Sequence, residues 1–71
     1  MDIPSEYKCP ITHEIMKDPV IDNEGNSYEK EYIEKWLSRN RTSPISRRPL
    51  HIRDLRPNIA LRILYRFLMK N

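Results

Sequence analysis

The sequence predicts a small α+β domain in which a β-hairpin, a central helix and a C-terminal helix are connected by two long loops. Two observations carry this prediction. A chain of 71 residues has room for a single small hydrophobic core. The spacing of apolar residues also changes along the chain: short strand-like stretches flank the only glycine, Gly25, whereas the regions after Glu29 and after Pro57 repeat apolar residues at helical intervals.

Residues 1–19 are expected to form an extended entry followed by a loop. Pro4, Pro10 and Pro19 each remove a backbone donor there and restrict the preceding residue. Residues 20–22 and 27–28 are then expected to pair as a hairpin around a turn at residues 23–26. Gly25 is predicted to adopt the positive φ angle that such a turn requires.

A first helix is predicted from Glu29 to about Arg39, with Asn40 ending it in a left-handed conformation. The residues assigned to its apolar face are Tyr32, Ile33, Trp36 and Leu37. Residues 41–50 are expected to form the second loop, since Pro44 and Pro49 interrupt regular structure there. Residues 51–55 are interpreted as a short strand.

A second helix is predicted to begin at Pro57, where the missing N–H of proline costs nothing. The residues assigned to its apolar face are Ala60, Leu61, Leu64, Phe67 and Leu68. A basic stripe of Arg62, Arg66 and Lys70 is expected on the opposite side. We interpret this stripe as a solvated helix face rather than a phosphate-binding site, because no aromatic platform accompanies it.

The net charge and the lengths of the apolar runs limit the functions and locations that the chain can have. The net charge of +3 permits nucleic-acid contact without arguing for it, because anionic protein partners explain it equally well. Apolar runs are too short for a membrane span, and no signal-peptide core follows Met1. We therefore expect a cytoplasmic or nuclear setting, or the host cytosol if the chain comes from a pathogen effector. No internal repeat, low-complexity stretch or linker is found.

The two loops carry related motifs. Ser43-Pro44-Ile45-Ser46-Arg47 follows the Cys-Pro-x-Cys-Arg frame of zinc-binding ring domains, but hydroxyls replace both thiolates. The segment 9–12, Cys-Pro-Ile-Thr, likewise has Thr12 at its second ligand position. Neutral hydroxyls are poor zinc ligands, so we expect no metal and no cofactor. Hydrogen bonds from Thr12, Ser43 and Ser46 to charged neighbours are expected to hold the loops instead, with Asp18, Glu29 and Lys30 as candidate partners.

With these motifs the chain resembles a U-box, the zinc-free relative of the RING domain of ubiquitin ligases. The resemblance covers residues 3 to about 68, and the ordered series of segments is more specific than any single one. The matching segments are Ile3-Pro4, Cys9-Pro10-Ile11-Thr12, Glu14-Ile15-Met16, Asp18-Pro19-Val20, Gly25, Ser27-Tyr28-Glu29-Lys30, Ile33, Trp36-Leu37, Thr42-Ser43-Pro44, Arg47, Pro49-Leu50, Leu55 and Pro57-Asn58-Ile59-Ala60-Leu61. We expect residues 1–71 to be one such domain, cut from a larger protein.

The resemblance implies a docking platform that activates a ubiquitin-conjugating enzyme without covalent chemistry of its own. Arg47 is the expected linchpin, donating hydrogen bonds to the conjugating enzyme and to ubiquitin so that the thioester meets a substrate lysine. The residues expected to contact the conjugating enzyme are Ile11, His13, Trp36, Pro44 and Ile45. At the position of His13 the family commonly has a larger apolar residue, which puts docking strength in question and could make docking pH-sensitive. Asn58 is expected to tie the second helix to a loop.

Several alternatives stay open at this stage. Ile11 and Trp36 could be core residues, Pro44 could only shape its loop, and Arg47 could be an ordinary solvated arginine. Cys9 could carry ubiquitin as a nucleophile, with His13 as its base, although a small buried residue is the more economical interpretation. The domain could also be a non-catalytic module that docks a substrate or forms a homodimer.

Overall fold

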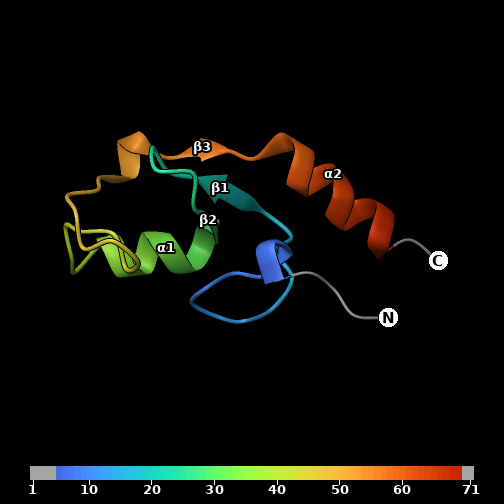
Figure 1. The fold of residues 1–71 in the computed structure, drawn as a ribbon, viewed down its shortest axis with the longest axis horizontal. Helices are drawn as coiled ribbons and strands as arrows, with labels where there is room; N and C mark the ends of the chain where they lie inside the picture. The colour runs from blue at the N-terminus through green and yellow to red at the C-terminus, as the bar shows by residue number, and fades with distance from the viewer. Residues whose placement is uncertain (1–4, 70–71) are drawn as a thin grey trace.

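The computed structural model describes residues 5–69, so Ile3-Pro4 of the matching segments and Lys70 of the basic stripe lie outside the described residues. The elements, in chain order, are η1 (Ser5–Tyr7), β1 (Pro19–Ile21), β2 (Ser27–Glu29), α1 (Lys30–Leu37), η2 (Ile52–Asp54), β3 (Arg56–Pro57) and α2 (Ile59–Leu68). The molecule is elongated, 38 × 20 × 19 Å, with α1 and α2 toward opposite ends and the small sheet between them (Figure 1). The predicted α+β class is confirmed.

The sheet contains three antiparallel strands in the order β2-β1-β3. The predicted hairpin is its first half, with Val20 opposite Tyr28. Gly25 has a φ of 87° in the turn, as predicted. The Asp22 carboxylate holds this turn by accepting hydrogen bonds from the backbone N–H groups of Glu24 (2.8 Å) and Asn26 (2.9 Å).

The third strand and the start of the second helix differ from the prediction. Residues 52–54 form a 3-10 turn, closed by reciprocal bonds between His51 and Asp54, and the strand is Arg56–Pro57. Pro57 is therefore the second residue of a strand and not the first of a helix. It also drives the residue before it, Arg56, toward an extended backbone. Asn58 caps α2 instead: its side chain accepts a hydrogen bond from the Leu61 N–H, and a proline cannot make this bond.

The first helix is two residues shorter at its end than predicted, and Asn40 ends it differently. Within residues 5–69 the only non-glycine residues with positive φ are His13 and Arg47, so Asn40 is not left-handed. Its backbone N–H and side-chain amide both donate to the Trp36 carbonyl, at 2.9 and 3.1 Å. Tyr32, assigned to the apolar face, is exposed, and the Lys35 ammonium lies 5.3 Å from its ring centre.

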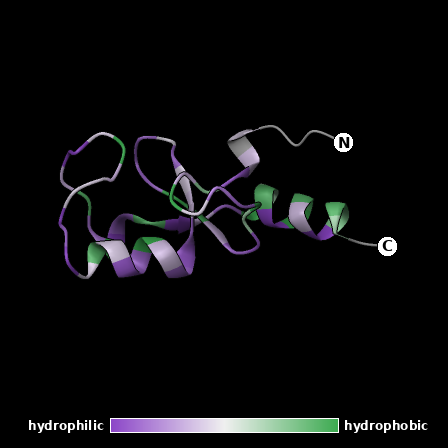
Figure 2. Cartoon of the chain, turned by 90° about the horizontal axis from the view of Figure 1, so that it is seen from below, coloured by the Kyte–Doolittle hydropathy of each residue, from purple (hydrophilic) through white to green (hydrophobic). Residues whose placement is uncertain are grey.

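The second helix buries only part of the apolar face predicted for it. Leu61, Leu64 and Leu68 are partly buried, whereas Ala60 and Phe67 point outward. Ile59, Ile63 and Phe67, spaced by four residues, form an exposed apolar stripe, and Phe67 is 75% exposed. Figure 2 shows the hydrophobic colour recurring along α2. Arg62 does not lie on a solvated face, because its guanidinium pairs with Asp18 at 2.7 Å. Neither α1 nor α2 is long and apolar enough to cross a membrane.

A single core lies where the sheet, α1 and the loop before β1 meet. Its buried members are Cys9, Met16, Val20, Tyr28 and Ile33. Ile11, Trp36, Leu37, Leu55 and Leu61 pack against this cluster while staying partly exposed. The core therefore reaches the surface through Ile11 and Trp36, which come from the first loop and from α1.

Candidate protein-docking site

Two surface loops adopt the same backbone conformation. The first loop (residues 8–15) is closed by a bridge between Lys8 and Ile15, and the second loop (residues 42–49) by a bridge between Thr42 and Pro49. In the first, the His13 N–H donates to the Cys9 carbonyl at 2.7 Å; in the second, the Arg47 N–H donates to the Ser43 carbonyl at 3.0 Å. The sequences Cys-Pro-Ile-Thr-His and Ser-Pro-Ile-Ser-Arg, at 9–13 and 43–47, thus form a short internal repeat, contrary to the expectation of none.

A buried relay holds the inner side of the second loop. The Ser43 hydroxyl, 1% exposed, accepts hydrogen bonds from the Ile45 and Ser46 N–H groups at 3.1 Å each and lies 3.3 Å from the Tyr28 hydroxyl. Tyr28 donates its one proton to Asp22 at 2.9 Å, so Ser43 is the donor in the Tyr28–Ser43 bond. Burial, together with the neighbouring Asp22 carboxylate, raises the pKa of Tyr28 to about 12.

A second set of bonds holds the outer side of the same loop. The Ser46 hydroxyl donates to Glu24 at 2.6 Å, and Arg48 approaches the other oxygen of that carboxylate at 3.8 Å. Hydroxyl bonds were expected here, but to Asp18, Glu29 or Lys30. Ser46 does bond to a charged residue, Glu24 of the hairpin turn, whereas the side-chain partner of Ser43 is the uncharged Tyr28 of β2.

The first loop is held by a carboxylate and a thiol. Cys9 is fully buried, and its sulfur accepts hydrogen bonds from the Ile11 N–H (3.4 Å) and the Glu29 N–H (3.3 Å). The Glu29 carboxylate accepts from the N–H groups of Lys17 (3.0 Å) and Asp18 (2.9 Å). Thr12 bonds only within its own loop, to the Glu14 N–H at 3.2 Å. Over residues 5–69, no group of three or more His, Cys, Asp or Glu side chains is arranged to hold a metal ion.

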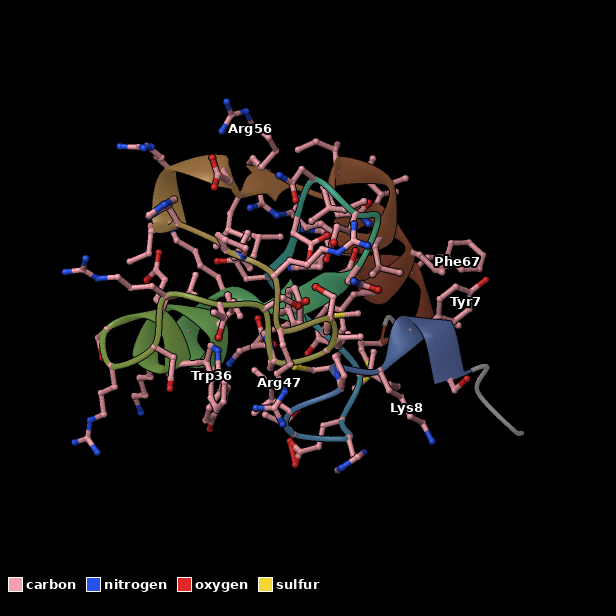
Figure 3. The ribbon with its side chains drawn as sticks, turned by 60° about the vertical axis from the view of Figure 1, so that its left-hand side comes forward. Tyr7, Lys8, Trp36, Arg47, Arg56 and Phe67 are labelled. Carbon is pink, nitrogen blue, oxygen red and sulfur yellow. The ribbon has the colours of Figure 1, made fainter. Side chains whose placement is uncertain are left out.

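The residues assigned to docking come from both loops and from α1. Ile11 and Trp36 are partly buried against the core and partly exposed, so each combines the two roles weighed above. The Trp36 indole N–H donates to the Thr42 carbonyl at 2.7 Å, which fastens α1 to the second loop. Pro44 is partly buried in that loop. In Figure 3 the side chains of Trp36 and Arg47 point to the same side of the molecule, away from Arg56.

The other assigned contacts lie at the edges of this surface. His13 and Arg47 are both exposed at the ends of their loops. Ile45 is 49% exposed and lines a hollow of about 240 Å³ together with Pro10 and residues of the hairpin turn. A larger hollow, about 860 Å³, is lined mainly by polar and charged side chains of the first loop and α1, and none of the assigned apolar residues is among them.

Asp18 and Asn58, expected in the polar network of the loops, bond instead to residues of α2 and β2. Asp18 forms its ion pair with Arg62 of α2. Asn58 caps α2 with its side-chain oxygen, at 3.1 Å from the Leu61 nitrogen, and donates its amide N–H to the Ser27 hydroxyl at 3.0 Å. Asp18, just before β1, and Ser27 of β2 thus fasten α2 to the region of the sheet, at the opposite end of the molecule from α1 (Figure 1).

Sequence reasoning missed the residues that organise the second loop: Asp22, Glu24 and Tyr28. A partial signal for Asp22 was present, because an aspartate followed three residues later by glycine is typical of a side-chain-stabilised turn. A tyrosine in the second hairpin strand also needs a partner for its hydroxyl once its ring is buried. Glu24 gave no such signal, since its bond to Ser46 joins residues 22 positions apart.

Comparison with known proteins agrees with this architecture. The family model described as "U-box domain" matches residues 3–71. The chain is 56% identical over 61 residues to the WD repeat, SAM and U-box domain-containing protein 1 of Danio rerio, which covers 84% of this chain and 12% of that protein. It is 46% identical over 63 residues to the E3 ubiquitin-protein ligase SPL11 of Oryza sativa subsp. japonica, covering 87% of this chain and 9% of that protein.

A third relative is the E3 ubiquitin-protein ligase PUB22 of Arabidopsis thaliana, 44% identical over 66 residues, covering 90% of this chain and 15% of that protein. The chain thus spans only a small part of the length of these relatives. The family model, the level of identity and the α+β fold with two hydrogen-bonded loops all lead to one assignment. This chain belongs to the U-box family.

Proposed function

We propose that this chain is a ubiquitin-ligase module that docks a ubiquitin-conjugating enzyme and promotes transfer of ubiquitin from its thioester to a substrate lysine. Relatives named E3 ubiquitin-protein ligases support this proposal. The single observation that carries it is the second loop. That loop carries Pro44 and Arg47, and hydrogen bonds join it to Tyr28 (through Ser43), to Glu24 (through Ser46) and to Trp36 (through Thr42). We take residues 1–71 to be one domain of a longer protein.

In the proposed mechanism the domain acts as a scaffold. Ile11, Trp36 and Pro44 provide the apolar centre of the interface, and Ile45 and His13 extend it on either side. The Arg47 guanidinium, with its five N–H donors, bridges carbonyl groups of the conjugating enzyme and of ubiquitin and holds the thioester in one orientation. The substrate amine then attacks the thioester carbonyl, an isopeptide bond forms, and the thiol of the conjugating enzyme is released.

A covalent route through this domain is disfavoured by the position of its thiol. Cys9 is fully buried, and its sulfur already accepts two backbone hydrogen bonds. A nucleophilic cysteine must instead be accessible and beside a base. His13 is exposed at the end of the loop, so the pair does not form the dyad considered from sequence.

The test is a single-turnover discharge assay. Conjugating enzymes from a panel are charged with ubiquitin, and loss of the thioester to free lysine is followed with and without the domain. The proposal predicts acceleration with at least one conjugating enzyme. If the folded domain binds a charged conjugating enzyme but accelerates discharge from no member of the panel, ligase activity is excluded in favour of binding alone.

A second candidate function, docking of another protein or homodimerisation, is favoured by the stripe of Ile59, Ile63 and Phe67 on α2. These side chains are 54%, 59% and 75% exposed, so the helix carries an apolar surface that residues 5–69 leave uncovered. This stripe belongs to α2, whereas the proposed docking surface is built from the two loops and α1. Sedimentation equilibrium of the wild type and of Phe67→Ser tests for a dimer: a concentration-dependent mass in the wild type alone supports it.

A further inference from the structure

Arg47 lies between two residues that contact the same carboxylate. On one side, the Ser46 hydroxyl donates to Glu24 Oε1 at 2.6 Å; on the other, Arg48 Nη1 lies 3.8 Å from Glu24 Oε2. Glu24 itself is in the hairpin turn, whose backbone is held by Asp22. The turn therefore contacts the chain immediately before and immediately after the proposed linchpin.

The backbone at Arg47 is left-handed, and part of what holds it is the bond from the Ser43 N–H to the Arg48 carbonyl at 2.8 Å, which the first loop also has. The φ of Arg47, 67°, lies in the left-handed region, which costs a residue with a Cβ atom on the order of 1 kcal/mol and persists only where the surroundings hold it. Ser43 fixes the beginning of the loop from the buried side. Beyond Ser46 the loop is exposed, and contacts to Glu24 are the side-chain bonds that tie this part to the rest of the domain.

The first loop offers an internal comparison. It has the same backbone conformation, but Thr12, which corresponds to Ser46, bonds only to the Glu14 N–H of its own loop. Glu14, which corresponds to Arg48, is exposed. The two contacts to Glu24 are thus particular to the loop that carries the arginine. The left-handed conformation alone does not explain them, because both loops share it.

We propose that Glu24 is a positioning residue for Arg47: by holding Ser46 and Arg48, it keeps the arginine backbone in one conformation and the guanidinium directed at the bound conjugating enzyme. The inference rests on the proposed ligase function and extends it to a residue outside the docking surface. A short bond between a hydroxyl and a carboxylate is among the stronger neutral-to-charged hydrogen bonds. The more distant Arg48 contact is exposed and contributes less.

The experiment compares Glu24→Ala and Glu24→Gln with the wild type in lysine discharge. Glu24→Ala removes both contacts and is expected to slow discharge about 3- to 10-fold, the range for one hydrogen bond of ordinary net strength, because the Ser46–Glu24 bond is exposed to solvent; binding of the conjugating enzyme should be unchanged. Glu24→Gln keeps an oxygen that can accept the Ser46 proton and is expected to recover most of the rate. Glu31→Gln, an exposed carboxylate on α1, is the matched control and should behave as the wild type.

A double-mutant cycle separates positioning from a general structural role. If Glu24 acts through Arg47, then Glu24→Ala should slow discharge no further when Arg47 is already alanine. A structural readout independent of activity accompanies the cycle: amide hydrogen exchange at Arg47, whose N–H donates to Ser43, should accelerate in Glu24→Ala. An equal slowing in both backgrounds, or an unchanged rate and unchanged exchange in Glu24→Ala, would overturn the inference.

The same cycle distinguishes failure of the inference from failure of the proposed function. If Arg47→Ala slows discharge but Glu24→Ala does not, only the positioning role of Glu24 is lost. If Arg47→Ala leaves discharge unchanged, the linchpin assignment itself is wrong, and the inference falls with it.

Discussion

His13 and Arg47 occupy the same position in two copies of one loop. Each follows a Cys/Ser-Pro-Ile-Thr/Ser segment, each donates its backbone N–H to the carbonyl four residues earlier, and their φ angles are 63° and 67°. One loop therefore presents an imidazole and the other a guanidinium from equivalent backbones. In the proposed complex, the two side chains would mark the two edges of the docking surface, with Ile11 and Pro44 between them.

The left-handed backbone at His13 leads to a prediction about stability. A β-branched residue fits this conformation poorly, so His13→Val should lower the free energy of unfolding by about 1–2 kcal/mol. His13→Gly should change it by less than about 0.5 kcal/mol, because relief of strain offsets the greater freedom of glycine in the unfolded chain. Urea denaturation of both variants measures the free energy of unfolding. Equal stability of His13→Val and His13→Gly would contradict the role given to the left-handed backbone.

Ile11 is the expected apolar anchor of the first loop. Because it is partly exposed while packed on the core, Ile11→Ala should weaken binding of the conjugating enzyme by about 1–3 kcal/mol and cause a smaller loss of stability. Titration calorimetry or NMR titration measures the affinity. Ile52→Ala is a matched control, since Ile52 is an exposed isoleucine of η2 and belongs to neither loop. Equal affinities for the two variants would remove Ile11 from the interface.

Glu29 is expected to be a strongly stabilising carboxylate. It is 8% exposed and accepts hydrogen bonds from two consecutive backbone N–H groups. Glu29→Ala leaves both donors without this partner, which should cost about 2–4 kcal/mol, a large share of the stability of so small a domain. Thermal unfolding monitored by circular dichroism provides the measurement, with Glu31→Ala as the exposed control; a similar melting temperature for both would be inconsistent with this role.

Tyr28 should make the domain sensitive to alkaline pH. Its pKa is about 12 in the folded protein, above the ordinary value of 10.0, so the folded state holds the proton more tightly than the unfolded chain. The resulting stabilisation is fully present below pH 10 and is lost as pH rises toward 12, by up to about 1.4 kcal/mol per pH unit. Tyr28→Phe should be less stable than the wild type at pH 8, and this difference should shrink by pH 11. A constant difference in urea unfolding would argue against the assignment.

The fold class, the hairpin and the family were predictable because they depend on local signals. Gly25 marks the turn, the spacing of Ile33, Trp36 and Leu37 marks α1, and the ordered motifs identify the family. The inward face of α2 was predictable only in part. Ile59, Ile63 and Phe67 are spaced by four residues, and Leu61, Leu64 and Leu68 by three and four, so both sets fit a helix; only packing decides which of them is partly buried.

The partners of the loop hydroxyls were not predictable for a different reason. Ser43 and Ser46 were expected to bond to charged residues close in the first loop or at the start of α1. Their partners lie instead in the hairpin, at Tyr28 and Glu24, which approach only after the sheet has formed. Arg62 is a similar case, because its pairing with Asp18 joins residues 44 positions apart.

The most direct test of the account is to measure binding and discharge separately for Arg47 variants. Arg47→Gly suits the left-handed backbone and Arg47→Ala shortens the side chain with a modest backbone cost, so the two together separate the guanidinium from the loop. The account predicts that both variants bind the conjugating enzyme within about twofold of the wild type while discharge falls at least about tenfold. Discharge at the wild-type rate in a folded Arg47→Gly domain would contradict the linchpin role.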